Sequence, residues 1–242
     1  MLKGWISGIG WVTVDGCGQG RRGDAFALSG GELPVLARAD VFSQPDRRFG
    51  RMDPFSRLGL AGIAFALRDA GLEEWDRQRS IGLIAATTYG CLATDGAYFD
   101  TVIPEGGALA SPQLFAYTLP NTFLGEAAIR FGLTGSTQVV SSCHSSGLEP
   151  LALALECLNW EEEGCLVAGV CDLNPPPGVA AVAGALLPGA VFLVLERELR
   201  PELPAYGELV RAAGGELVFA GSPVADVGEL VRRCLADRGS KP

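Results

Sequence analysis

The chain has 242 residues, of which 48% are hydrophobic and 19% are charged, enough to bury the core of one sizeable α/β domain. Its 28 acidic and 19 basic residues give a net charge of −9, and the absence of a basic stripe argues against nucleic acid or an anionic membrane surface as a partner. With no signal-peptide pattern and no apolar run long enough for a membrane span, we expect a cytoplasmic protein.

Short apolar strands alternate with amphipathic helices along the chain. The pattern predicts strands at 5–14, 81–88, 137–142, 165–170 and 190–196, and helices at 53–71, 121–132 and 147–160. Continuous apolar strands that alternate with helices are typical of a sheet covered on both faces. We therefore predict an α/β fold with a mixed, mostly parallel sheet of about five strands and helices on both faces.

Two helices have start signals in the sequence. Asp53 is the expected N-cap of the helix at 53–71, with Pro54 at its first position. A last helix is expected to begin at the cap Ser222, with Pro223 at its first position, and to stop at Gly239. Its predicted core-facing stripe consists of Val227, Leu230, Val231 and Cys234. No repeat or linker interrupts the chain, so we expect a single domain over 1–242, with a core at 5–200 and a tail at 203–242.

Seven cysteines and a single histidine limit the metal chemistry of the chain. The cysteines form no C-x-x-C pair, and one histidine cannot complete an ordinary zinc site. We expect mostly buried free thiols, no metal and no cofactor. The carboxylate run 161–163 is interpreted as a solvated loop at a helix end.

The stretch "VVSSCHSSG" (139–147) is the main candidate for chemistry, because it places Cys143 beside His144 between a strand and a helix. One interpretation is an acyl-transfer site with a thiol nucleophile and its base. The other is the remnant of such a site. Adjacent residues rarely face each other on a strand, so we do not interpret the two as a catalytic dyad.

Three stretches resemble the β-ketoacyl synthase family, the condensing enzymes of fatty acid and polyketide synthesis. They are "RMDPFSRLGLAGIAFALRDAGL" (51–72), "IGLIAATTYGCLATDGAYFDTV" (81–102) and "SPQLFAYTLPNTFLGEAAIRFGLTG" (111–135). The resemblance implies a thiolase-like fold, in which two similar α/β halves stack their sheets. It runs from near residue 5 to about residue 210 and covers the N-terminal half of the family only. The two active-site histidines of the family belong to the other half, so this chain is not expected to supply them.

The position of the family's nucleophilic cysteine depends on the alignment register. We align the chain with the family from "LTG" (133–135) onward without gaps. The later motifs "SSG" (145–147) and "VAG" (167–169) then stay in register, and the family's cysteine falls on His144. Placing it on Cys143 requires a deletion and a compensating insertion. In the family this residue lies on a tight strand-to-helix elbow, where the helix N-terminus stabilises its thiolate. A histidine cannot form the acyl thioester, so no catalytic residue is expected, with Cys143 as the alternative.

The resemblance also implies the partners. Some condensing enzymes pair an active ketosynthase with a degenerate sister, the chain-length factor, and truncated examples accompany aryl polyene clusters. We expect a catalytically silent subunit that forms a heterodimer with a full-length β-ketoacyl synthase and meets acyl carrier protein only indirectly. Without the second half, part of one sheet face is expected to need cover from a partner or from the tail. The alternatives are a half-size acyltransferase that uses Cys143 and a scaffolding or acyl-binding module.

The resemblance also implies which residues form the dimer contact and which form the floor of the acyl tunnel. The dimer contact is expected at Val139, Val140 and Ser141, together with the segment 111–124. The segment "SPQLFAYTLPN" (111–121) is expected to close the partner's acyl tunnel, with Leu114 and Phe115 at its floor and Thr118 nearby. These apolar residues are equally compatible in type with an ordinary interface or core.

Overall fold

The computed structural model describes residues 1–104, 106–142, 144–160 and 163–236. Its strands form one sheet in the order β4-β3-β5-β6-β1-β7-β8-β9, with β2 paired to β1. The strands are β1 (Leu2–Thr13), β2 (Gly16–Gln19), β3 (Ile81–Thr87), β4 (Thr137–Ser141), β5 (Cys165–Asp172), β6 (Gly189–Glu196), β7 (Gly207–Arg211), β8 (Leu217–Phe219) and β9 (Ser222–Pro223).

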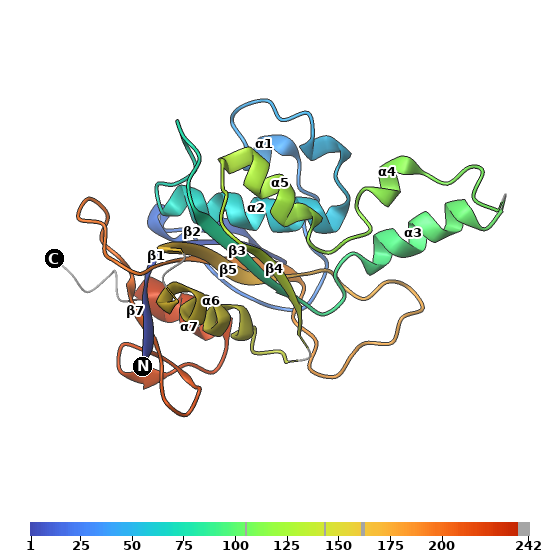
Figure 1. Ribbon diagram of the computed structural model, residues 1–242. Helices are drawn as coiled ribbons and strands as arrows, with labels where there is room; N and C mark the ends of the chain where they lie inside the picture. Colours follow the sequence, from blue (N-terminus) through green and yellow to red (C-terminus); the bar gives the residue numbers. More distant parts are fainter. Residues whose placement is uncertain (105, 143, 161–162, 237–242) are drawn as a thin grey trace.

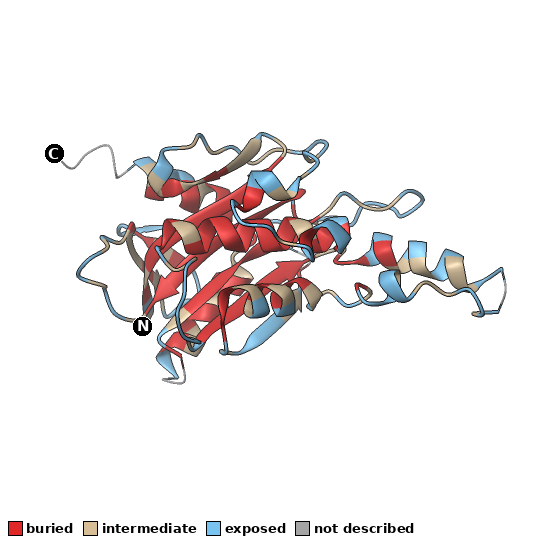
Figure 2. Cartoon of the chain, turned by 90° about the horizontal axis from the view of Figure 1, so that it is seen from above, coloured by how far each residue is buried: buried red, intermediate tan, exposed pale blue. Residues whose placement is uncertain are grey.

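Helices cover both faces of this sheet (Figure 1). One face carries α1 (Arg38–Val41), α2 (Pro54–Asp69) and α5 (Thr122–Phe131), and the other carries α6 (Glu149–Asn159) and α7 (Val227–Ala236). Two hydrophobic clusters, one on each side of the sheet, form the core, and the buried residues follow the strands and the inner helix faces (Figure 2). The short 3-10 helices η1 (Gly20–Arg22) and η2 (Phe49–Arg51) lie in the connections. No helix in the described ranges has the length and hydropathy that a membrane crossing requires.

The predicted α/β class, the mixed sheet and the helices on both faces are confirmed, but the sheet differs in two details. It has nine strands in the described part of the chain instead of about five. Only β3–β4 and β3–β5 pair in parallel, and the other pairings are antiparallel. A continuous apolar sequence indicates that a strand is buried on both faces, but it does not indicate the direction of the strand. Strand β6, for example, is buried throughout, although both its neighbours are antiparallel to it.

Helix α2 begins as predicted and packs unusually close to the sheet. The Asp53 side chain accepts a hydrogen bond from the Ser56 backbone N–H at 3.0 Å, and Pro54 occupies the first turn. On β1, a side chain at Gly10 would place its Cβ only 2.1 Å from the Ala66 nitrogen of α2. Glycine is therefore required at Gly10, because any larger residue would push the central helix off the sheet.

The carboxy-terminal segment is part of the same sheet. Strand β7 pairs with the first half of β1, with Leu2 opposite Arg211. Just before β7, the Tyr206 hydroxyl donates to the Asp69 carboxylate at 2.7 Å, and the Ile9 backbone N–H donates to the same carboxylate at 2.8 Å. These bonds join the tail to α2 and β1. Burial raises the pKa of Asp69, although the hydrogen bonds from Tyr206, Arg21 and Ile9 oppose the shift.

The last helix, α7, begins later than predicted. Ser222 and Pro223 form strand β9 against β8, and the side chain of Asp226, not Ser222, accepts from the first turn, from the Glu229 N–H at 2.7 Å. The predicted stripe is confirmed, since Val227, Leu230, Val231 and Cys234 are all at most 2% exposed. The predicted stop Gly239 lies outside the described residues.

Candidate functional site

The stretch that follows β4 is an open elbow. Strand β4 ends at Ser141, and the Ser142 N–H donates to the Thr87 carbonyl at 2.9 Å. The Ser142 hydroxyl then accepts from the His144 N–H at 3.2 Å and donates to the His144 carbonyl at 3.1 Å. His144 itself is exposed. Cys143, the alternative nucleophile, lies outside the described residues.

Helix α6 begins five residues after His144, at Glu149. Gly147 has a left-handed φ of 64°, and the Val227 N–H of α7 donates to the Ser146 carbonyl at 2.8 Å. This segment therefore forms a separate turn between strand and helix, fastened to the carboxy-terminal helix. The arrangement differs from the tight elbow that the resemblance implies, because the first turn of α6 does not start at His144. The partial positive charge of a helix N-terminus acts only over the first turn, so it does not reach this position.

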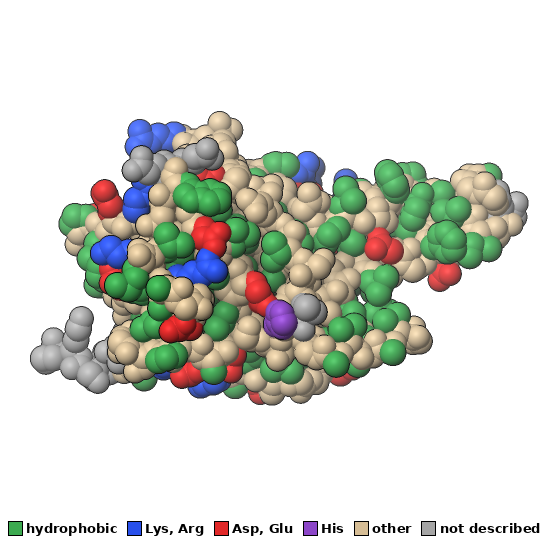
Figure 3. All heavy atoms as spheres, turned by 60° about the horizontal axis from the view of Figure 1, so that its bottom comes forward, with side chains coloured by type: hydrophobic (Ala, Val, Ile, Leu, Met, Phe, Trp, Pro, Cys, Tyr) green, Lys and Arg blue, Asp and Glu red, His purple; other side chains and the backbone are tan. Residues whose placement is uncertain are grey.

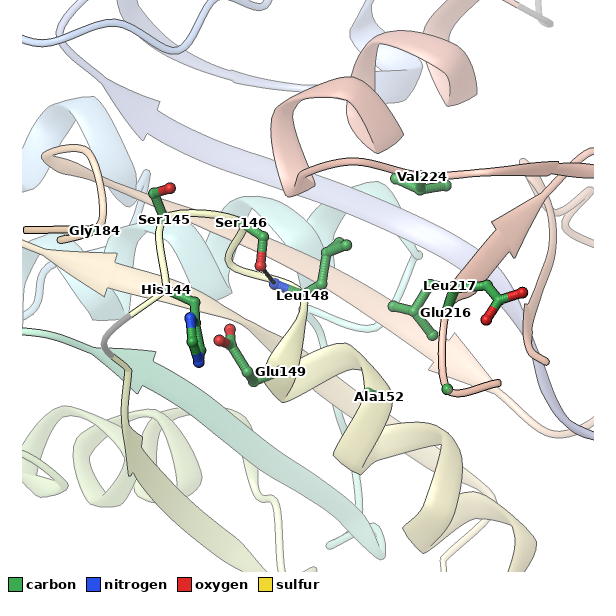
Figure 4. A pocket seen from close by; sticks show the side chains of 11 residues that line it. His144, Ser145, Ser146, Leu148, Glu149, Ala152, Gly184, Glu216, Leu217 and Val224 are labelled. Atoms are coloured by element: carbon green, nitrogen blue, oxygen red, sulfur yellow. Dashed lines mark hydrogen bonds between the residues drawn. The ribbon is translucent and has the colours of Figure 1, made fainter. Parts of the chain in front are cut away.

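A hollow of about 570 Å³ lies at this elbow, between the start of α6 and the β7–β8 hairpin. His144, Ser145 and Glu149 line one side, and Glu216 and Leu217 line the other (Figure 4). The imidazole of His144 and the carboxylate of Glu149 face each other across a short gap in Figure 4. The lining offers an imidazole, hydroxyls and carboxylates, but no thiol among the described residues. It can bind polar groups, and none of its described lining residues forms an acyl thioester.

The described cysteines are all free thiols. Burial, reinforced by the neighbouring Asp95 carboxylate, raises the pKa of Cys91 to about 12. Burial also raises the pKa values of Cys165 and Cys171. A thiol with a raised pKa carries almost no thiolate at neutral pH, so these three are structural residues and not nucleophiles.

The predicted tunnel residues lie on an arm that projects from the body, which we call the α3–α4 arm (residues 92–104 and 106–119). It contains α3 (Leu92–Val102) and α4 (Pro112–Phe115) and extends away from the sheet (Figure 1). Phe115 is on its surface and packs its ring on Tyr98, with ring centroids 5.4 Å apart. The Thr118 hydroxyl donates to the Phe115 carbonyl at 2.9 Å. Leu114 is half-buried and lines a cavity of about 320 Å³ at the base of the arm.

The predicted interface residues lie on the edge strand β4. Val139 and Val140 are half-buried and Ser141 is exposed. Val139 packs toward the cluster under α2, and Val140 packs toward the cluster under α6. Strand β4 pairs with β3 on one side and, among the described strands, with none on the other. Its outer backbone groups are therefore available to a further strand.

The sequence prediction missed the apolar surface of the arm, because it placed no helix between residues 88 and 121. Five large side chains there are between 59% and 73% exposed: Phe99, Ile103, Leu109, Phe115 and Leu119. Apolar side chains also gather along the arm in the space-filling view (Figure 3). The signal that could have found them is the helix-compatible stretch "LATDGAYFDTV", in which the fold buries only Thr94.

The fold agrees with the comparisons to known proteins. Residues 32–187 match the family described as β-ketoacyl synthase, N-terminal domain, and the chain belongs to this family. A putative polyketide β-ketoacyl synthase 1 of Streptomyces virginiae is 29% identical over 149 residues, which cover 57% of this chain and 35% of that protein.

Two solved structures share the fold. The ishigamide ketosynthase/chain length factor superposes with a TM-score of 0.66 at 15% identity, covering 86% of this chain and 62% of that chain. A ketosynthase in complex with its chain length factor from Xenorhabdus doucetiae gives a TM-score of 0.54 at 16% identity, covering 82% and 80%. The chain thus spans only about a third of the curated relative and under two thirds of the first of these structures.

Proposed function

We propose that this chain is a catalytically silent ketosynthase-like subunit of the chain-length-factor type. It pairs with a full-length β-ketoacyl synthase in the cytoplasm and shapes that enzyme's acyl tunnel during fatty acid, polyketide or aryl polyene synthesis. Acyl carrier protein docks on the partner, because a chain with a net charge of −9 repels an acidic carrier.

The observation that carries the pairing is the apolar surface of the α3–α4 arm. Single exposed apolar residues are ordinary, but a contiguous group of large ones on a projecting segment is typical of a protein interface. The arm is tied to the body at its base, where the Thr94 hydroxyl donates to the Asp53 carboxylate at 2.6 Å and Tyr117 is buried. The arm therefore presents Phe99, Ile103 and Leu109 to a partner.

The edge strand β4 supports the same proposal. A partner strand that pairs with its free edge would satisfy backbone groups that otherwise face water. It would also cover the exposed parts of Val139 and Val140. Both structural neighbours are described as a ketosynthase together with a chain length factor, which fits a paired subunit.

Catalytic silence is supported by the chemistry of the elbow. The ungapped register places His144 at the nucleophile position, and the helix N-terminus that would stabilise an anion begins five residues later. The alternative, a half-size acyltransferase, rests on Cys143. Labelling with cerulenin separates the two, because only a tunnel-facing thiolate reacts. Labelling that disappears in Cys143→Ser would favour the acyltransferase.

The pairing is tested by co-expression with a full-length β-ketoacyl synthase, followed by size-exclusion chromatography with light scattering. We expect a 1:1 complex for the wild type. The double variant Phe99→Ser/Leu109→Ser should lose about 2 kcal/mol of binding free energy, or roughly 30-fold in Kd. The matched control is Val35→Ser, which removes an apolar side chain that is 92% exposed elsewhere. A wild-type chain that stays monomeric with the ketosynthase present contradicts the proposal.

Silence is tested separately on the isolated chain. We expect no condensation of malonyl carrier protein, and none after His144→Cys, because a restored thiol still lacks groups for decarboxylation and oxyanion stabilisation. Condensation by either protein alone would contradict a silent subunit without bearing on the dimer.

A further inference from the structure

The cavity at the base of the α3–α4 arm has a composition unlike the elbow hollow. Its volume is about 320 Å³, within the range of about 300–1,000 Å³ usual for small-molecule sites. Apolar side chains form much of its wall, among them Met52, Leu114 and Leu173. Two arginines, Arg51 and Arg57, also line it. The cavity therefore combines an apolar wall with guanidinium groups.

These two guanidinium groups have no carboxylate partner among the described residues. Arg57 donates from Nη2 to the Gly50 carbonyl at 3.2 Å, while its Nε is buried and has no hydrogen-bond partner in the described part of the chain. A buried donor without an acceptor is costly. The Nε atoms of Arg57, Arg79 and Arg197 have this state among the described residues, and of these three arginines Arg57 lines the cavity. The Arg57 side chain is thus a donor that lacks its acceptor.

The nearby carboxylate does not satisfy the two arginines. Asp53 also lines the cavity, but its oxygens accept from the Ser56 N–H at 3.0 Å and from the Thr94 hydroxyl at 2.6 Å. Its carboxylate is occupied as the cap of α2.

A second cavity, which also has Met52 in its wall, contains two arginines that are paired with carboxylates. There Arg48 pairs with Glu126 at 2.9 Å, and Arg130 pairs with Asp46 at 3.1 Å. Two of the three arginines that line the second cavity are therefore matched by carboxylates and Arg47 is not, whereas neither Arg51 nor Arg57 has a carboxylate partner among the described residues.

We propose that the cavity at the base of the arm binds an anionic amphiphile, namely a carboxylate or a phosphate ester joined to a short apolar chain. The planar guanidinium groups of Arg51 and Arg57 match the two-oxygen geometry of either anion. The apolar chain lies against Leu114 and Leu173 and is removed from water there. This site is formed within one chain, so it does not depend on the proposed partner.

The test is isothermal titration of the full chain with octanoate and with octyl phosphate, and with octanamide as the neutral probe. We expect saturable 1:1 binding of at least one anion and weaker binding of octanamide. Arg57→Gln should weaken the anion by about ten- to a hundredfold, as the loss of a charge-assisted hydrogen bond requires. Binding of octanoate alone would assign a carboxylate ligand, and binding of octyl phosphate alone a phosphate ester.

Two further variants keep the test decisive if Arg57→Gln does not fold by circular dichroism. Ala97→Phe places a ring in the cavity from an exposed position of α3 and should also block binding. Arg232→Gln changes an exposed arginine on α7 and should bind like the wild type. The proposal is overturned if neither anion binds the wild type, if octanamide binds as tightly, or if the folded Arg57 and Ala97 variants keep wild-type affinity.

Discussion

Replacing Leu230 by alanine tests whether the carboxy-terminal helix is an integral part of the domain. Leu230 is fully buried, at 0% exposed, in the cluster between α7, α6 and the sheet. A buried Leu→Ala change costs about 2–5 kcal/mol, through lost burial and the cavity left behind. Alanine is at least as good a helix former as leucine, so the loss reports packing alone. We expect a decrease of about 3 kcal/mol in the free energy of unfolding and, for a chain of this size, of about 6–12 °C in Tm.

The assay is urea unfolding followed by circular dichroism, with Arg232→Ala as the matched control on the same helix. Arg232 is exposed, so its removal should change stability by less than about 0.5 kcal/mol. A loss below about 1 kcal/mol for Leu230→Ala would refute the reasoning, because it would mean that α7 does not pack on the sheet as a unit of the fold.

Three further predictions concern the interface, the tunnel and the buried acid. Val139→Asp should keep the fold, because Val139 is only half-buried. It should prevent co-elution with the ketosynthase, because an unpaired carboxylate at the interface costs several kcal/mol of binding free energy. Leu114→Trp should shorten the products of the reconstituted complex, and Leu114→Ala or Phe115→Ala should lengthen them. The reason is that each methylene of the acyl chain that the tunnel buries is worth about 0.8 kcal/mol. Mass spectrometry measures the product lengths. Burial raises the folded-state pKa of Asp69 above the unfolded value of about 3.9. The folded protein therefore binds this proton more tightly, its stability falls as pH rises between those two values, and Asp69→Asn should remove that slope from the urea midpoints.

Each of these has a distinct contrary outcome. Loss of the circular dichroism signal in Val139→Asp would place that residue in the core and not at an interface. Unchanged products from intact heterodimers of all three tunnel variants would mean that the segment is not the gate. A wild type whose stability relative to Asp69→Asn rises with pH in this window would mean that hydrogen bonds from Tyr206 and Ile9 outweigh burial.

The central elements could be predicted because their signals are local. Helix α2 starts at Pro54 and β3 starts at Ile81, as the cap and the apolar run indicated. The stripe of α7 was predicted for the same reason. Its start was not, because Ser222 and Pro223 are recruited as a strand by β8, and this pairing has no signature within the helix itself.

Long-range contacts explain most of what the sequence did not reveal. Glu163 was expected in a solvated loop, but it is 7% exposed and its carboxylate accepts from the Ser136 N–H and hydroxyl. The partner is 27 residues away and lies just before β4. In the candidate site, the sequence pattern could not separate Leu114 from Phe115, since both are large and apolar. The packing of α4 separates them, with Leu114 at a cavity and Phe115 exposed on the surface.

The structure also changes the physical reason for expecting a partner. On the sequence alone, the need for one came from a sheet face that lacks part of its helical cover. That face is covered by α6 and α7, and the α7 residues Val227, Leu230 and Val231 are almost completely buried. Five large exposed side chains lie instead on the α3–α4 arm, which projects away from the sheet (Figure 1). The case for a heterodimer therefore rests on the arm and on the edge strand β4, and variants of the arm will decide it more directly than variants of the tail.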